Sequence, residues 1–394
     1  MSYEATTTVP TASSHGSAGR RGSAPKAVAS SSRMRDGLER LVTRGLGVDE
    51  FARDVSRIIR RSIPFDGVSV LTMDPATGLA TKAFVENGLQ GGAAVRIAEI
   101  EYLEPDVNKF DALASSGRIA ASLSAATGGN LRQSRRHREL RAPHGFGDEL
   151  RTVLVTEEVL WGSVTLGRTS ELHSFTPAEV ELMASISSIL AEGLRHAVVL
   201  APPPGKSSDD EADEDQNLAG IALVARDNTI LRADAAGTAW LKELRAAEPD
   251  VPLPSVMAAV AIRARGAAGH RGPPSVLARA RTRSGTWLTV RGSVLGGDED
   301  APTAITLEPA RPHELAPLLA DAYELTPRER RVVWLVAQGL DTDAIAAHLF
   351  ISPWTVQDHL KSIFEKVGVN SRGELTARLY LDRTAPRLNP RDLP

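Results

Sequence analysis

The spacing of hydrophobic residues in the first half of the chain changes from helical to strand-like and back again. Intervals of three and four separate Phe51, Val55, Ile58 and Ile59. Four strand-like runs follow, at 66–73, 79–85, 151–156 and 161–168, and the turn sequence DPATG joins the first two. Thr176 and Glu179 then form a predicted capping box that begins a helix through residue 194. This pattern predicts an antiparallel sheet flanked by helices.

A second strand-rich pattern lies further along the chain. Its strand-like runs are residues 220–226, 229–233, 278–282, 286–294 and 304–308, and a helical pattern covers residues 235–244. Asp227-Asn228 and Ser284-Gly285 are turn sequences. Two strands, a helix and a three-stranded meander predict a five-stranded sheet. A further helix is expected at residues 315–323.

The C-terminal pattern predicts four short helices over residues 325–380. Thr326 with Glu329, Ser352 with Pro353, and Ser371 with Glu374 are start signals, because Ser and Thr cap the free N–H groups of a first helical turn. Gly339 and Gly368 lie where helices are expected to end. Four short helices joined by tight turns predict a helix-turn-helix domain.

Three segments lack this periodicity. Residues 1–34 are rich in Ser, Thr, Ala and Gly, so we expect a disordered tail. Residues 201–216 contain three prolines followed by six acidic residues, which predicts a linker. Residues 385–394 are expected to be a second tail. The predicted domains are therefore 35–200, 217–312 and 319–384.

Composition narrows the classes of function. The formal net charge is −3 and there is no cysteine, which excludes disulfides and thiolate metal sites. No phosphate loop of the GxxxxGK type and no serine-nucleophile or glycosidase constellation is present. We therefore expect no enzymatic activity, no cofactor and no metal. Because no signal peptide and no long apolar run stands out, we expect a cytoplasmic protein without membrane contact.

Residues 132–144 combine two histidines, His137 and His144, with a group of arginines. Arginine suits phosphates and carboxylates, so one interpretation is a site for an anionic ligand, and the other is a solvated basic helix or loop. A metal site is disfavoured because no carboxylate stands at metal-ligand spacing. The arginines are Arg132, Arg135, Arg136, Arg138 and Arg141.

The C-terminal segment is similar to the LuxR-type helix-turn-helix. The similarity lies in LTPRE at 325–329, in Ile345, Ala346 and Leu349, and in ISPxTVxxHLxxIFxKxGVxSRxEL from Ile351 to Leu375. In that family the third helix lies in the DNA major groove, and the fourth often forms a dimer interface. The resemblance implies double-stranded DNA as a partner and a homodimer.

Carried over to this sequence, the resemblance makes residues 353–367 the DNA-reading helix. Its predicted buried stripe is Val356, Leu360, Ile363 and Phe364. Gln357 can read adenine, Asp358 can accept a hydrogen bond from cytosine, and Lys361 suits guanine or a phosphate. The predicted DNA-contacting residues are Ser352, Trp354, Thr355, Gln357, Asp358, Lys361 and Arg372.

This segment departs from the usual pattern of the family at Trp354, Gln357 and Asp358. Residues 323–384 hold eight basic and eight acidic residues, so we expect modest non-specific affinity for DNA. An alternative interpretation is that Asp358 only caps the helix or pairs locally, for example with Lys361 one turn away. Trp334 is expected to be partly exposed and to contact another domain or a second subunit.

Two further resemblances concern the preceding domains. HGFGDELRTVL (144–154), WGSVTLGR (161–168) and FTPAEVELM (175–183) are similar to GAF-like regions, and RTRSGTWLTV (281–290) lies in a region that resembles a PAS-type domain. The predicted fold class is multidomain α+β, with two mixed α/β sensor domains, GAF-like and PAS-like, and an all-α four-helix helix-turn-helix domain at the C-terminus.

These features predict a one-component transcriptional regulator. Its sensor domains would bind a small-molecule ligand or a protein partner and modulate binding of the DNA operator. The alternative is an interaction protein that binds a signal and whose DNA binding is weak or vestigial.

Overall fold

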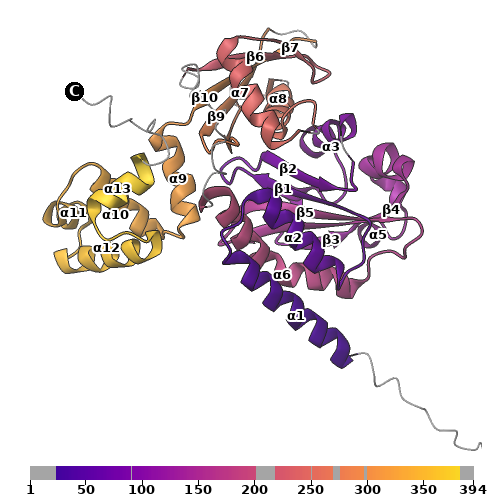
Figure 1. Cartoon of the computed structure of the whole chain (residues 1–394), viewed down its shortest axis with the longest axis horizontal. Helices are drawn as coiled ribbons and strands as arrows, with labels where there is room; N and C mark the ends of the chain where they lie inside the picture. Colours follow the sequence, from indigo (N-terminus) through magenta and orange to yellow (C-terminus); the bar gives the residue numbers. More distant parts are fainter. Residues whose placement is uncertain are drawn as a thin grey trace, which may run out of the picture.

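The computed structural model describes residues 24–89, 91–200, 218–249, 251–268, 276–296 and 300–381. The predicted linker 201–216 and the predicted tail 385–394 lie outside the described residues. The described part forms two five-stranded antiparallel sheets and a C-terminal group of helices (Figure 1). The predicted multidomain α+β fold class is therefore confirmed.

The first sheet has the strand order β2-β1-β5-β4-β3. Its strands are β1 (Gly67–Met73), β2 (Ala80–Glu86), β3 (Ala120–Ser122), β4 (Phe146–Thr156) and β5 (Val159–Thr169). Glu157 and Glu158, both with positive φ, make the tight turn between β4 and β5. The sequence pattern predicted four of these strands, but the three-residue strand β3 is too short to give an alternating pattern.

Three helices pack on one face of this sheet (Figure 1). They are α1 (Ala24–Val42), α2 (Val48–Arg60) and α6 (Pro177–Arg195). The capping box of Thr176 and Glu179 begins α6, as predicted. The start of α1 corrects one expectation, because this helix occupies residues 24–34 of the predicted disordered tail. Met34 and Leu38 of α1 are buried in the core, and this packing outweighs the polar composition.

The other face of the first sheet carries short segments that the sequence pattern did not predict. They are α3 (Gly92–Leu103), α4 (Phe110–Ser115), α5 (Leu123–Ala126), η1 (Leu131–Gln133), η2 (His137–Arg141) and η3 (Ala142–His144). The π-helical segment η4 (His196–Leu200) follows α6.

By length and composition, one stretch of the described residues, Pro177–Val199, could cross a membrane. Its apolar window is 56% buried, and α6 packs against β4 and α1.

The second sheet has the order β7-β6-β10-β9-β8. Its strands are β6 (Gly220–Val224), β7 (Ile230–Ala233), β8 (Val276–Arg281), β9 (Trp287–Val294) and β10 (Thr303–Pro309), and its helices are α7 (Ala235–Ala247) and α8 (Ser255–Ala268). All five strands and α7 follow the predicted pattern. Helix α8 was not predicted. Because most of its residues are buried, it lacks the polar face that marks an amphipathic helix.

The C-terminal group consists of short helical segments (Figure 1). They are α9 (Pro312–Ala322), α10 (Pro327–Ala337), α11 (Thr342–Leu349), α12 (Pro353–Val367), α13 (Arg372–Thr376) and η6 (Ala377–Leu381). Thr326 caps α10 in a capping box, Ser352 caps α12 and Ser371 caps α13. Gly339 and Gly368 have positive φ where α10 and α12 end. The predicted starts and stops are confirmed.

Buried polar contacts join the two sheet domains. Asp74, at the end of β1, pairs with Arg279 of β8. Glu248, after α7, accepts a hydrogen bond from the N–H of Ala83 in β2 at 2.8 Å. Burial raises the pKa of this carboxyl group above its ordinary value.

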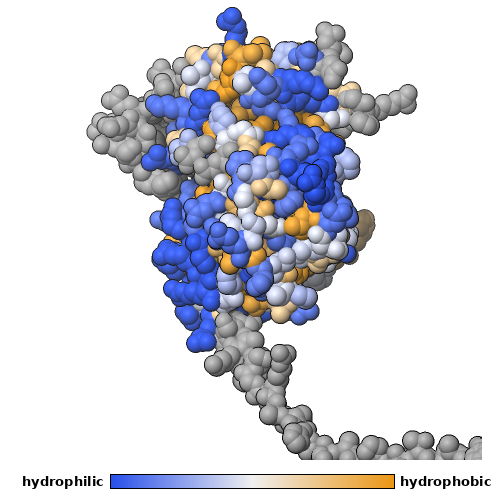
Figure 2. All heavy atoms as spheres, turned by 90° about the vertical axis from the view of Figure 1, so that its right-hand side faces the viewer, coloured by the Kyte–Doolittle hydropathy of each residue, from blue (hydrophilic) through white to orange (hydrophobic). Residues whose placement is uncertain are grey.

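Polar residues cover most of the face shown in Figure 2, with apolar patches between them.

Candidate nucleic-acid interface

Helix α12 has one buried and one exposed face. Val356, Leu360, Ile363 and Val367 are buried, and Phe364 is partly buried against the same core. On the opposite side, an exposed stripe at intervals of three and four includes Trp354, Gln357, Asp358 and Lys361. The structure thus brings together on one surface four of the residues that were predicted to contact DNA.

The N-terminus of α12 is built by Ser352 and Thr355. The N–H of Thr355 donates to Ser352 Oγ at 3.1 Å, and the two hydroxyl oxygens are 2.8 Å apart. Ser352 is exposed and Thr355 is half-buried. Free N–H groups and the helix dipole make such an N-terminus attractive to an anion. Phe350, in the turn before it, adopts the left-handed conformation with φ 55°.

Glu329 holds α10 against α12. Its carboxylate accepts hydrogen bonds from Ser362 Oγ at 2.7 Å and from Lys366 Nζ at 2.8 Å, and the backbone N–H of Thr326 donates to it at 2.7 Å. Burial alone would raise the pKa of Glu329, but these hydrogen bonds lower the pKa to about 2. Lys366 is therefore occupied inside the domain.

Arg372 also has an internal role. Its Nη1 donates to the backbone oxygen of Leu340 at 2.8 Å, and its Nη2 donates to Thr342 Oγ1 at 2.8 Å. These bonds attach the start of α13 to the start of α11. Arg372 is half-buried, and the DNA contact expected for it stays a prediction. Sequence position alone could not distinguish these two roles.

The same segment matches a known family. Residues 323–379 match the profile of the family described as bacterial regulatory proteins, luxR family. We call residues 323–379 the luxR-family segment. The confirmed resemblance covers the C-terminal helices, which are a small part of the chain.

Two curated relatives illustrate this similarity, and one solved structure is similar to a part of the chain. A putative HTH-type transcriptional regulator of Mycobacterium tuberculosis is 47% identical over 66 residues, which cover 17% of this chain and 7% of that protein. A putative HTH-type transcriptional regulator of Aeromonas salmonicida is 42% identical over 87 residues, covering 22% and 43%. The chain therefore spans less than half the length of these relatives. The GAF domain/HD domain protein from Geobacter sulfurreducens is 17% identical with a TM-score of 0.28, covering 38% of this chain and 93% of that one.

Some cations of the luxR-family segment are occupied in internal contacts, and others are exposed. Lys366 and Arg372 are occupied internally, and Arg330 pairs with Asp321 at 2.6 Å. Four cations remain exposed with no ion pair in the described part of the chain: Arg328, Arg331, Lys361 and Arg378. Within that same part, Asp358 and Lys361 form no ion pair with each other, so the structure does not contain the local pairing considered as an alternative.

Three large aromatic side chains of the luxR-family segment are exposed. Trp334 is 54% exposed, Trp354 72% and Phe350 95%. Most of the Trp334 surface is thus uncovered by other domains of this chain. Sequence reasoning missed Phe350, whose exposure follows from its place in the turn between α11 and α12.

The arginine-rich stretch 132–144 is not a solvated loop. Arg136, His137 and Arg141 are buried in the first domain, whereas Arg132 and Arg138 are exposed. Arg136 pairs with Asp106 at 2.9 Å and with Glu149. Among the described residues, no group of three or more His, Asp and Glu side chains could hold a metal ion.

Proposed function

We propose that this chain is a one-component transcriptional regulator that binds double-stranded DNA in a sequence-specific manner. The observation that supports the proposal most directly is the exposed stripe Trp354, Gln357, Asp358 and Lys361 on α12 of a luxR-family segment. Helices of this kind read base edges in the major groove when polar side chains line their outward face. The two preceding sheet domains are proposed to act as sensors.

Each residue of the interface has a proposed role. Gln357 pairs with an adenine, Asp358 accepts from a cytosine, and Lys361 binds a guanine or a phosphate. Ser352 and Thr355 place the N-terminus of α12 against a backbone phosphate. Trp354 lies at the edge of the groove, where its apolar ring can contact a thymine methyl group. Arg372 supports the domain through its internal hydrogen bonds.

The test is DNA binding by the full chain over a series of salt concentrations. The probes are a fragment from upstream of its own gene and an unrelated fragment of equal length. Lys361→Ala is expected to weaken binding and to reduce the salt slope by about 1. Gln357→Ala should relax the preference at one base pair by about 1–3 kcal/mol. Lys242→Ala, an exposed lysine of α7, is the matched control.

Undetectable binding, or equal binding to both fragments at every salt concentration, would contradict this proposal. That result would favour the alternative, an interaction protein with weak or vestigial DNA binding. The balanced charge of the segment gives this alternative its support, since few cations are available to attract DNA.

We also propose that two copies bind one operator and that the protein acts in the cytoplasm. Four exposed cations give one copy little non-specific affinity, and a second copy multiplies the contacts. Trp334 is the proposed subunit contact, because a large exposed aromatic residue typically belongs to an interface. Sedimentation of wild type and Trp334→Ala measures this. An unchanged oligomeric state would reject the role of Trp334.

A further inference from the structure

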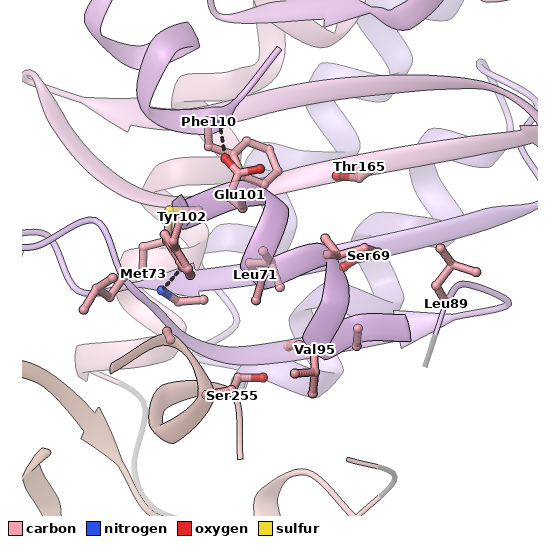
Figure 3. Close-up of a pocket in the computed structure, with 18 of the residues that line it drawn as sticks. Ser69, Leu71, Met73, Leu89, Val95, Glu101, Tyr102, Phe110, Thr165 and Ser255 are labelled. Carbon is pink, nitrogen blue, oxygen red and sulfur yellow. Dashed lines mark hydrogen bonds between the residues drawn. The ribbon is translucent and has the colours of Figure 1, made fainter. Parts of the chain in front are cut away.

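A cavity of about 240 Å³ lies between the two sheet domains (Figure 3). One wall is the face of β1 and β2, a second wall is α3, and the start of α8 closes it from the second domain. Its volume is just below the range of about 300–1,000 Å³ that is usual for ligand pockets, so an occupant must be small. Both sensor domains contribute to this single cavity.

The cavity is long and largely apolar. Lining residues follow β1 from Gly67 to Met73, a length of roughly 20 Å at about 3.4 Å per residue. Leu71 and Val95 line it from the first domain, and Ala258 lines it from α8. An occupant therefore needs an elongated apolar body.

Arg141 lines one end of this cavity and is only partly neutralised. Its side chain is 9% exposed, and its Nε lies 2.9 Å from Glu149 Oε2. This contact is an ion pair without hydrogen-bond geometry, so the buried Nε atom has no hydrogen-bond partner. The same carboxylate also binds Arg136. In the described part of the chain, neither terminal nitrogen of Arg141 has a hydrogen-bond partner.

The surroundings of Arg141 disfavour its charge. Burial is the largest cause that lowers its pKa from the ordinary arginine value, and the neighbouring Arg136 and Arg151 act in the same direction. Arg141 cannot lose its charge by deprotonation at neutral pH, since arginine stays charged in proteins. A buried guanidinium with unused donors is therefore a binding group for an anion.

Glycines let Phe146 and Arg141 pack closely against the first sheet. Gly67 and Gly167 are paired across β1 and β5. A Cβ atom on Gly167 would come within 2.8 Å of the Phe146 ring and 3.7 Å of Arg141 Nη1. Arg141 also lies over the Phe146 ring at 5.5 Å, which fixes its position. The cation is thus held at the Gly67 end of the cavity.

The opposite end offers a neutral donor. The Tyr102 hydroxyl oxygen accepts from the N–H of Ala80 at 2.9 Å, and its own proton has no acceptor in the described part of the chain. Burial raises the pKa of Tyr102, so the hydroxyl keeps its proton. Ala80 pairs with Met73, which places Tyr102 at the Met73 end.

We propose that this cavity binds a small, elongated, mainly apolar monocarboxylate, with its carboxylate on Arg141 and its far end near Tyr102. Its role as the signal of the regulator rests on the function proposed above, whereas its binding does not. The ligand touches α3 of one domain and α8 of the other, so it stabilises one relative arrangement of the two domains. DNA affinity then shifts by linkage.

The binding test is isothermal titration of the full chain with hexanoate, octanoate and decanoate, and with 1-octanol as the uncharged control. Saturable binding of one carboxylate at a ratio of one per chain is expected, with 1-octanol at least about 10-fold weaker, since a hydrogen bond to a charged group contributes that much. No binding by any carboxylate, or equal binding of octanoate and 1-octanol, would overturn the proposal.

Variants assign the site. Arg141→Gln should weaken carboxylate binding by about 10- to 100-fold and leave the affinity for 1-octanol unchanged. Arg138→Gln removes an exposed arginine of the same stretch and should bind like wild type. Val95→Trp fills the cavity and keeps every charge, so it should abolish binding without loss of the folded circular dichroism spectrum. Carboxylate binding that survives Val95→Trp would place the ligand elsewhere and reject this cavity.

DNA binding is measured separately, on the same protein with and without the bound carboxylate. Carboxylate binding without any DNA binding would reject the proposed function and keep the ligand site. DNA binding without carboxylate binding would reject the ligand site and keep the proposed function.

Discussion

Asp74 at the end of β1 and Arg279 of β8 form a buried ion pair that joins the two sheets. Arg279 Nη2 and Nε donate to the carboxylate at 2.6 and 3.0 Å, and its backbone N–H donates at 2.7 Å. Nη1 of Arg279 donates to the backbone oxygen of Glu314 at 2.7 Å. Glu314 lies in α9, which leads into the luxR-family segment. One arginine therefore contacts the first domain and the helix that precedes the luxR-family segment.

Asp74→Asn is expected to destabilise the full chain by about 3–5 kcal/mol. The change leaves Arg279 buried without its counter-charge, and breaking a buried pair on one side has a cost of this size. Urea unfolding followed by circular dichroism measures the loss. Asp54→Asn is the control, because Asp54 pairs with the exposed Arg44 and Arg57 and should lose less than about 1 kcal/mol. Equal losses in the two variants would contradict the importance of the buried pair.

The double variant Asp74→Asn with Arg279→Met should separate sensing from DNA binding. It removes both charges, so its stability should exceed that of Asp74→Asn alone. Because the bridge from Arg279 to Glu314 is gone, the bound carboxylate should no longer change operator affinity. The protein should still bind both the carboxylate and the operator DNA. Titration and DNA binding measure the two affinities. An unchanged ligand effect on operator binding would show that coupling takes another route.

Acid should destabilise the C-terminal helices through Glu329. Its pKa is lowered to about 2 in the fold, against about 4.5 when unfolded. Its contribution is therefore present above pH 4.5 and is lost as the pH falls toward 2, with an upper size of about 3 kcal/mol. Unfolding of wild type and Glu329→Gln between pH 2.5 and 7 tests this. The difference in stability between the two proteins should shrink on acidification, and a constant difference would disprove the assignment.

Asp358→Asn should change specificity more than affinity. Loss of the negative charge strengthens binding to unrelated DNA by roughly 2- to 10-fold at about 0.1 M salt, and the gain falls as salt rises. Replacing the carboxylate by an amide, whose oxygen is a weaker acceptor and whose NH2 group is a donor, weakens operator binding by about 1–3 kcal/mol relative to unrelated DNA. Glu365→Gln, an exposed acid of the same helix, is the control. Equal gains on both DNAs would mean that Asp358 reads no base.

Local signals predicted the elements whose ends are marked in the chain. Thr326, Ser352, Gly339 and Gly368 place the helix boundaries of the luxR-family segment because caps act within one turn. The alternating strands of both sheets were predicted because successive side chains of a strand point to opposite faces, which also depends only on close neighbours. Helix α8 was missed because it is buried on nearly all sides, and β3 because it is too short.

The candidate interface was predicted more completely than the cavity. Gln357, Asp358 and Lys361 share a helix face that follows from spacing alone, whereas the internal hydrogen bonds of Arg372 to residues 340 and 342 could not be predicted from the sequence. The arginine-rich stretch gave two open interpretations, and only burial separated Arg136 and Arg141 from Arg132 and Arg138.

By itself, the sequence determined the luxR-family segment, its helix boundaries and the alternation of both sheets, since these depend on neighbours within a few residues. Only the tertiary structure decided which charges are paired. Asp74 and Arg279 are far apart in the chain, and nothing in a turn sequence or a strand pattern indicates their contact. The same holds for the cavity, whose walls come from β1, α3 and α8. Contacts between distant residues depend on how domains pack, and that is a property of the whole fold.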